Sequence, residues 1–310
     1  MNSSADQDAI FRAAHVGASE VSALFGCNPW LSEFELFHRK RGNIAVPEFN
    51  AIRSDGTPEA ERIYWGVKLE AAIVEGAKER FGYIDREPAD PPLSNGRGLG
   101  GHPDRRVICP ERGPGILEVK MADWLVFKGW GDEPPTNYQI QGNTCAGLDK
   151  VTWFDVIVLV GGNQLERFKR DFRPKLYAET EKRVEKFWDD VRADRAPKPD
   201  YARDKDAIAE LYADAGDDVI DLKGDNLAHV AAAEYLIGHA EEKAGKARKE
   251  AAQAELLDKL GMHGVALLDG FTVRATRVAA VPDRTITAED IGSTITGRKS
   301  YRRMTVKEKA

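Results

Sequence analysis

Three side chains of complementary charge, Asp104, Glu118 and Lys120, stand on a stretch of sequence that predicts a β-hairpin. A Gly-Gly-His-Pro turn signal precedes Asp104, and a β-type run follows it over 105–108. After a break rich in Pro and Gly, the chain resumes as a strand over 116–120. The hairpin therefore brings an acid at the start of its first strand close to an acid and a lysine on its second.

The spacing on the second strand indicates what these groups could do. Glu118 and Lys120 are two residues apart and project to one face, whereas Leu117 and Val119 face a core. Two acids without a counter-ion repel each other, and a hard divalent cation with oxygen ligands removes that repulsion. An ammonium beside a metal-bound water can orient the nucleophile and offset charge on a phosphoryl group. In a chain with 31% charged residues the same pattern also fits a solvated strand face, so both interpretations stay open at this point.

Composition limits the class of protein. A chain of 310 residues with 42% hydrophobic residues can build a large core, and no run approaches the roughly 18 apolar residues of a membrane span. The N-terminus lacks the order of a signal peptide, so we expect a cytoplasmic protein without a membrane partner. Cys27, Cys109 and Cys145 form no C-x-x-C pair, which argues against a disulfide framework, a zinc ribbon or an iron-sulfur cluster.

The charge pattern gives little general attraction for nucleic acid. The net charge is -6, and both parts of the chain are mildly acidic. The one clearly basic segment covers residues 298–309, where Glu308 is the single acid. This segment fits either a local DNA contact or a solvated tail.

Periodicity and capping signals predict alternating helices and strands in the first two thirds of the chain. Glu70 lies in the middle of one predicted helix, and Ser19 is expected to cap another. The Pro-rich sequence at 194–201 predicts a boundary between a domain over residues 1–200 and an appendage over 201–310. The expected elements are helices over 8–26 (interrupted near residue 18), 33–40, 59–81, 136–148 and 175–193, and strands over 151–160 and 164–171.

In the appendage, the sequence predicts one long helix over 227–260, a hairpin over 265–278 and a helix capped by Thr287. Small and branched residues recur on the long helix every seven positions and could pack a partner helix closely. Packing on the chain's own core is the favoured interpretation, and packing on another subunit is the alternative. The two series are Val230, Ile237, Ala244 and Ala251, and Ala233, Ala240, Ala247 and Ala254.

Several motifs in this order resemble those of the lambda-exonuclease-like branch of the PD-(D/E)xK nucleases, the YqaJ-type viral recombinases. The resemblance covers roughly residues 8–195, and the order of the motifs makes it specific. The matching residues are Gly17-Ala18-Ser19-Glu20, Pro29-Trp30, Trp65-Gly66 through Glu70, Pro103-Asp104, Glu118 with Lys120, and Gln139-Ile140-Gln141.

The resemblance implies a fold and a chemistry. The fold is a restriction-endonuclease-like core of the α/β (α+β) class, with a mixed central sheet flanked by helices. The activity is hydrolysis of DNA phosphodiesters with Mg2+, for which Mn2+ can substitute. Asp104 and Glu118 would bind the metal with the Val119 carbonyl, Glu70 would hold a second metal or its water, Lys120 would position the attacking water, and Gln141 would hold Lys120 or the nucleophile.

Some of these residues also fit structural roles. Glu70 in mid-helix could be a solvated residue, and Gln139 fits a capping box with Thr136, so the site role goes to Gln141. Trp30 and Trp65 are expected to be packing anchors. Where the family often has a small residue after the first acid, this chain has Arg105, which leaves the local loop geometry open.

The family's direction of digestion depends on a terminal phosphate. Arg12 precedes Ser19 by seven residues, the arrangement with which the family holds a 5′-phosphate, and a guanidinium with a hydroxyl suits that ligand. We therefore expect a phage-type exonuclease that digests linear double-stranded DNA from 5′ to 3′ and leaves single strands for recombination. The resemblance alone implies a single-strand annealing partner, a ring-shaped homo-oligomer and a phage or bacterial origin. The alternatives are an endonuclease or nickase on the same fold, and a non-catalytic DNA-binding or assembly protein.

Overall fold

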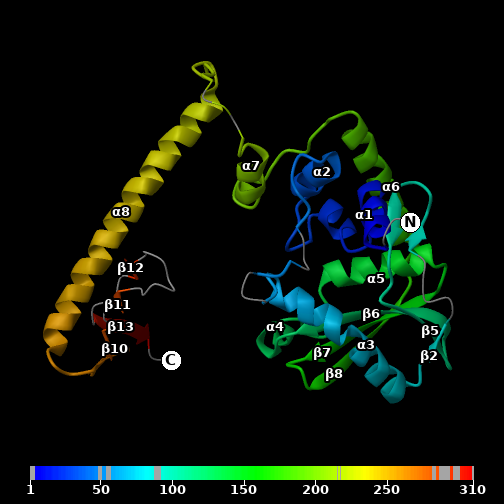
Figure 1. Cartoon of the computed structure of the whole chain (residues 1–310), viewed down its shortest axis with the longest axis horizontal. Coiled ribbons are helices and arrows are strands. Elements are labelled where there is room, and N and C mark those ends of the chain that lie inside the picture. The colour runs from blue at the N-terminus through cyan, green and yellow to red at the C-terminus, as the bar shows by residue number, and fades with distance from the viewer. Residues whose placement is uncertain are drawn as a thin grey trace. The chain divides into compact units, whose positions relative to one another are not determined.

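The computed structural model describes residues 4–47, 51–53, 57–86, 92–214, 216, 218–280, 284–285, 294–295 and 301–308. It divides into two compact units, residues 1–216 and 217–310 (Figure 1). The domain boundary that the sequence indicates after residue 200 stays a prediction. The first unit extends past it because helix α7 (Lys205–Leu211) buries Ala207 against Phe34 and Ile44.

A five-stranded mixed sheet forms the centre of the first unit, in the order β2-β5-β6-β7-β8. Its strands are β2 (Ile84–Asp85), β5 (Arg105–Cys109), β6 (Gly113–Ala122), β7 (Trp153–Val160) and β8 (Gln164–Asp171). Strands β5 and β6 are antiparallel, with Arg105 opposite Leu117, as the hairpin pattern predicted. Strand β7 runs parallel to β6, and β8 returns antiparallel to β7. The expected α/β class with a mixed central sheet is confirmed.

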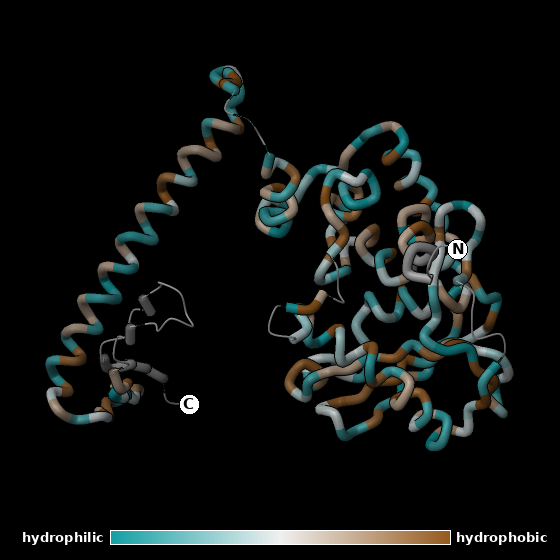
Figure 2. The backbone as a smooth tube through the Cα atoms, viewed as in Figure 1, coloured by the Kyte–Doolittle hydropathy of each residue, from teal (hydrophilic) through white to brown (hydrophobic). Residues whose placement is uncertain are grey.

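The two faces of this sheet are covered by different helices. Helix α3 (Glu61–Phe81) packs Ile73 and Val74 against Leu117 and Val119, so the predicted inward face of β6 is confirmed. Helix α5 (Thr136–Leu148) covers the other face, where Val156 lies in the core. Hydrophobic residues accordingly concentrate along the central strands (Figure 2).

A second layer packs outside α5. It buries Phe37 and Val184 in one core with part of α5. A smaller sheet, in the order β1-β4-β3, joins this layer to the hairpin, since β4 ends shortly before β5. The elements of the second layer and its small sheet are α1 (Ser4–Ala14), β1 (Val16–Gly17), the 3-10 helix η1 (Val21–Phe25), α2 (Glu33–Arg41), β3 (Leu93–Ser94), β4 (Leu99–Gly101) and α6 (Pro174–Arg192). The short helix α4 (Trp124–Lys128) instead packs Phe127 with Phe168 of the central sheet.

Helix capping follows the sequence at some ends and departs from it at others. Ser32 caps α2 and accepts a hydrogen bond from the Glu35 backbone at 2.9 Å, as a helix starting at residue 33 requires. Ser19 does not cap a helix, because η1 begins two residues later and its N-cap is Glu20. Thr136 is the first residue of α5 and not its cap, so the predicted capping box does not form.

Helix α5 lies so close to β7 that the contact requires glycine. A Cβ atom at Gly142 would overlap the ring of Phe154, whereas one at Gly76 in α3 would meet only Leu165 at 4.0 Å. We expect Gly142→Ala to lower the free energy of unfolding by about 1–3 kcal/mol through overpacking. The matched variant Gly76→Ala should raise it by up to about 1 kcal/mol, because alanine favours a helix interior. Denaturant unfolding of both variants measures the difference, and equal effects would contradict the close approach.

The second unit consists of one long helix and small antiparallel sheets. Helix α8 (Asn226–Leu260) and the hairpin of β9 (Val265–Leu268) with β10 (Phe271–Val278) confirm the predicted elements. Leu260 packs on Val273 and Ala275, and it is the one buried residue of α8 within the described residues. Val230 and Ile237 are exposed, so neither packs on the core of the second unit, and the surface on which the small-residue series packs stays a prediction. Hydropathy alternates along the whole helix (Figure 2).

The basic C-terminal segment contributes a strand. Strand β13 (Tyr301–Glu308) pairs antiparallel with β10, with Val273 opposite Val306, so this part is not a free tail. The short strands β11 (Arg284–Thr285) and β12 (Thr294–Ile295) pair with each other. The predicted helix cap at Thr287 lies outside the described residues. None of the helices that the structure describes is long and apolar enough to cross a membrane.

Candidate active site

Strand β6 carries Glu118 and Lys120 on the face of the sheet that α5 covers. Because β6 lies between β5 and β7, Glu118 is enclosed by strands on both sides, and its side chain is 0% exposed. The Lys120 ammonium forms an ion pair with Glu118 Oε1. The predicted side-by-side projection is therefore confirmed, but the face is buried and not solvated.

Asp104 reaches the same place from the turn before β5. Its Oδ2 accepts a hydrogen bond from the Val119 backbone N–H at 2.6 Å, which holds the carboxylate across the hairpin. The carboxylate of Glu118 is close enough for each of the two acids to influence the pKa of the other. The structure thus brings together Asp104, Glu118 and Lys120, which are separated by 16 residues at most in sequence.

Glu70 joins this group from helix α3. It is half-buried, and the charges of Asp104, Lys120 and Arg105 all act on its carboxylate. Burial, followed by repulsion from Asp104, raises the pKa of Glu70 to about 7. A solvated residue in mid-helix would not show such a shift, so the position of Glu70 favours the site interpretation.

The acids of the hairpin also have raised pKa values. Desolvation and then repulsion from Asp104 raise the pKa of Glu118 to about 8. Burial raises the pKa of Asp104, although Lys120 and the Val119 N–H partly oppose it. Desolvation alone would lower the pKa of Lys120, but the carboxylates of Glu118 and Asp104 outweigh it and raise that pKa. Three acids with raised pKa values around one ammonium form a site with too little positive charge.

The donor set suits a hard divalent cation. Glu118 Oε2 is buried without a hydrogen-bond partner, and it lies beside the carboxylate of Asp104. An unpartnered buried oxygen among acids is the chemistry that Mg2+ requires. Among the residues that the structure describes, however, no three His, Cys, Asp or Glu side chains are arranged as a ready cage for a metal. The Lys120 ion pair occupies one Glu118 oxygen, so the predicted ligands Glu70, Asp104, Glu118 and Val119 stay a prediction.

The two glutamines of α5 have different environments. Gln139 donates to the Pro134 carbonyl at 2.8 Å and its own Oε1 accepts from Arg173 at 3.4 Å, so its role is structural, through contacts other than the expected capping box. Gln141 is half-buried on the same helix. In the described structure Lys120 makes no hydrogen bond with Gln141, and the predicted role of Gln141 stays a prediction.

An aromatic residue that the sequence did not single out borders the site. The Lys120 ammonium lies 5.1 Å from the ring centroid of Tyr138. The rings of Trp30 and Trp130 lie 6.3 and 5.6 Å from that of Tyr138. Trp30 is 69% exposed and Trp65 51% exposed, so the expectation that both are packing anchors is wrong. The position of Tyr138 directly before the Gln-x-Gln motif was the available signal.

The predicted phosphate-binding pair lies near an unforeseen lysine. Arg12, in the last turn of α1, and Ser19 are both exposed. Lys40 donates to the Arg12 carbonyl at 2.8 Å and to Glu20 Oε2 at 2.7 Å, and that carboxylate also accepts from the Gly17 backbone at 2.8 Å. The end of α1 and the turn around Ser19 are thus tied together, although contact of either side chain with phosphate stays a prediction.

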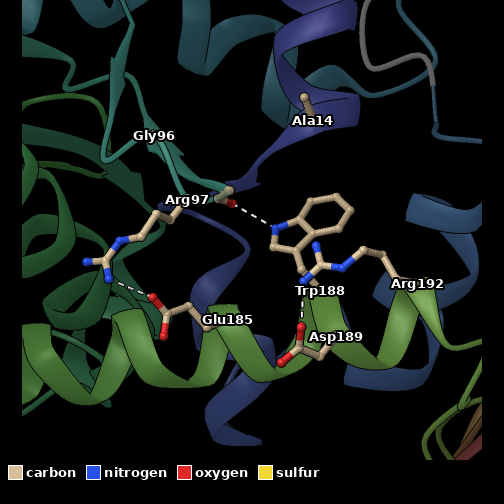
Figure 3. Close-up of a pocket in the computed structure, with 8 residues that line it drawn as sticks. Ala14, Gly96, Arg97, Glu185, Trp188, Asp189 and Arg192 are labelled. Carbon is tan, nitrogen blue, oxygen red and sulfur yellow. Dashed lines mark hydrogen bonds and ion pairs between the residues drawn. The ribbon is translucent and has the colours of Figure 1, made fainter.

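A pocket of about 550 Å³ lies elsewhere, between α6 and the loop after β3 (Figure 3). Trp188 Nε1 donates to the Gly98 carbonyl at 2.9 Å, and the charged side chains pair with one another. Arg97 binds Glu185 at 2.7 Å, and Arg192 binds Asp189 at 2.5 Å. Neither Lys120 nor any of the three predicted site acids, Glu70, Asp104 and Glu118, lines this pocket, so DNA cleavage is not expected there.

Comparisons with known proteins agree with the motifs. Residues 10–145 match the model of the YqaJ-like viral recombinase domain. The Bacillus subtilis (strain 168) protein named "Uncharacterized protein YqaJ" is 28% identical over 225 residues, which are 67% of this chain. The chain spans 62% of the length of that relative.

Two solved structures of one protein are similar to this chain. The alkaline exonuclease LHK-Exo from Laribacter hongkongensis matches with a TM-score of 0.44 and 19% identity, over 64% of this chain and 95% of that one. The same enzyme in complex with dAMP matches with a TM-score of 0.43 and 19% identity, again over 64% and 95% of the two chains.

Proposed function

We propose, from the premise that residues 10–145 form a YqaJ-like viral recombinase domain, that this protein is a metal-dependent deoxyribonuclease. The observation that carries the proposal is the buried group of Asp104, Glu118 and Lys120 on one hairpin, with Glu70 in electrostatic range. A non-catalytic relative would have no reason to keep acids whose burial costs stability.

The site residues would have different roles in the cleavage reaction. Asp104, Glu118 and Glu70 would hold Mg2+, or Mn2+ in its place, and the bound cation supplies Lewis-acid stabilisation of the phosphoryl oxygens. Lys120, once released from Glu118, would hold the attacking water by hydrogen bonds and offset the negative charge that develops on the phosphoryl oxygens. Burial of this face under α5 excludes bulk water and strengthens both interactions.

The finer proposal is an exonuclease that acts from 5′ to 3′ on linear double-stranded DNA and leaves single strands for recombination. It is supported by the match to the viral recombinase domain and by the exposed guanidinium of Arg12, which suits a terminal phosphate. An annealing partner, a ring-shaped oligomer and a cytoplasmic location stay predictions.

Incubation of the full chain with linear and covalently closed plasmid, with and without Mg2+, tests the function. Loss of the linear form alone, and only with Mg2+, is the expected result. Nicking of the closed circle would show that the protein is an endonuclease or nickase and not an exonuclease. No cleavage of either form with Mg2+ or Mn2+ would refute the nuclease proposal.

Arg12→Ala is expected to slow digestion of 5′-phosphorylated ends far more than digestion of 5′-hydroxyl ends. Loss of charge-assisted hydrogen bonds to a terminal phosphate corresponds to about 1.5–3 kcal/mol. Rates on the two ends measure it, with exposed Arg53→Ala as the matched control. Equal slowing on both ends, or digestion from 3′ ends, would show that Arg12 does not set the direction of digestion by binding a 5′-phosphate.

A further inference from the structure

A line of three side chains connects the candidate active site with the protein surface. It begins at the Lys120 ammonium, passes 5.1 Å to the ring of Tyr138, and continues 6.3 Å to the ring of Trp30. The Trp30 and Tyr138 rings are inclined by only 30° to each other. Trp130 supports Tyr138 from another direction at 5.6 Å.

Trp30, the outermost residue of this line, has an exposed ring, although hydrogen bonds fix its backbone. Trp30 is 69% exposed, while the backbone N–H groups of Trp30 and Leu31 both donate to Asn28 Oδ1, at 2.9 and 3.0 Å. Asn28 is 6% exposed and donates to the Ser19 carbonyl at 3.2 Å. A large apolar ring held outward on a rigid turn contributes little to the core, which is typical of a binding surface.

The base of the line is anchored in the fold. Tyr138 lies in the first turn of α5, and Trp130 packs with Phe127 and Phe168. The positive charges of Lys120 and Arg62 and the negative charge of Glu118 all act on the Tyr138 hydroxyl. A ligand that fits this arrangement has an anionic group beside Lys120 and a flat, polarisable ring that can stack outward.

We propose that Trp30 and Tyr138 form a stacking site for an unpaired nucleobase of the strand whose phosphate lies at Lys120. The site rests on the proposed nuclease function and specifies its substrate further. Bases inside a duplex are already stacked on their neighbours, so a base reaches Trp30 only after its pair has opened. The site therefore selects frayed or single-stranded ends, and it tolerates all four bases because each has a π-face.

Single-turnover cleavage of two duplexes tests the site. One duplex has a normal end, and the other has an abasic nucleotide at the position next to the scissile phosphate. Wild-type protein is expected to cleave the normal end roughly 5- to 100-fold faster. Trp30→Ala should bring this ratio close to one, Trp30→Phe should keep most of it, and the exposed Tyr212→Ala should leave it unchanged.

Binding without catalysis separates this proposal from the proposed function. An oligonucleotide with 2-aminopurine at its end is mixed with wild-type protein and with Trp30→Ala in the absence of divalent cation. Quenching of the base fluorescence by wild type but not by Trp30→Ala supports stacking even if no cleavage is found with Mg2+. Cleavage ratios and quenching that are the same for wild type and Trp30→Ala would overturn the stacking site and leave the nuclease proposal standing.

Discussion

Glu118→Gln is expected to abolish DNA cleavage, by on the order of 10³-fold or more, while the protein stays folded. The amide keeps the size of the side chain but removes the charge that would bind a cation beside Asp104. Glu118 is 0% exposed and has an unpartnered Oε2, so the oxygen that the variant replaces with an amide is the buried one that is free to bind a cation. Cleavage of linear DNA in Mg2+ measures the loss, with Glu111→Gln at the exposed hairpin turn as the matched control.

The same variant should change how stability depends on pH. The pKa of Glu118 is raised from 4.5 to about 8 in the folded protein, so between these values the folded state holds a proton that the unfolded state has lost. The free energy of unfolding of wild type without divalent cation therefore falls as pH rises from about 4.5 to about 8, by on the order of a few kcal/mol. Glu70, with a pKa of about 7, adds a slope of the same sign.

Unfolding in urea at several pH values between 4.5 and 8 tests this slope. Glu118→Gln should show a smaller decrease than wild type, and addition of Mg2+ should flatten the wild-type curve. A variant that degrades DNA at the wild-type rate would show that the metal site is misplaced. Parallel stability curves for the two proteins would contradict the raised pKa.

Lys120→Met is expected to lose turnover by on the order of 10²–10³-fold while cation binding is largely retained. The methionine fills the space of the lysine stem but cannot hold the attacking water. The variant also leaves Glu118 without its ion-pair partner, and this raises the pKa of that acid further. Near neutral pH protonation of Glu118 limits the damage. Above about pH 8, where Glu118 of the wild type ionises beside Lys120, the variant must hold the proton against the rising pH or bury a lone charge, so we expect a loss of about 3 kcal/mol in stability.

Calorimetric titration with Mn2+ and unfolding at pH 7 and pH 9 separate these effects. The control is Lys128→Met, an exposed lysine of α4. The double variant Glu118→Gln/Lys120→Met should recover much of the stability lost at pH 9, because it buries no unpaired charge. Loss of cation binding equal to the loss of turnover would contradict the role of Lys120 as a water-positioning residue.

The elements that position the site could be read from the sequence because their signals are local. The hairpin has its turn residues and its alternation within 20 residues, and β7 is a nearly continuous apolar run, so the places of Asp104, Glu118 and Lys120 followed. The family motifs added Glu70, which periodicity alone assigns to a solvated face.

Features that depend on distant contacts could not be read in this way. Ile63 and Val67 lie at helical spacing with Val74, but they are exposed, because only the second half of α3 meets the sheet. The contact of Trp30 with Tyr138 joins residues more than 100 positions apart, and no local pattern encodes it. The pairing of β13 with β10 likewise depends on tertiary contacts, so the basic segment was open to interpretation as a tail.

The Lys40 ammonium, which binds both the Arg12 carbonyl and the Glu20 carboxylate, has a consequence for the entropy of binding. Lys40 is only 6% exposed, and its two contacts fix the backbone of α1 relative to the turn that carries Ser19. A DNA end would then meet a surface whose backbone is already ordered, and only the outer bonds of the Arg12 side chain would lose freedom. Since each immobilised long side chain costs about 0.5–1.5 kcal/mol on association, this preorganisation keeps more of the phosphate interaction as net affinity.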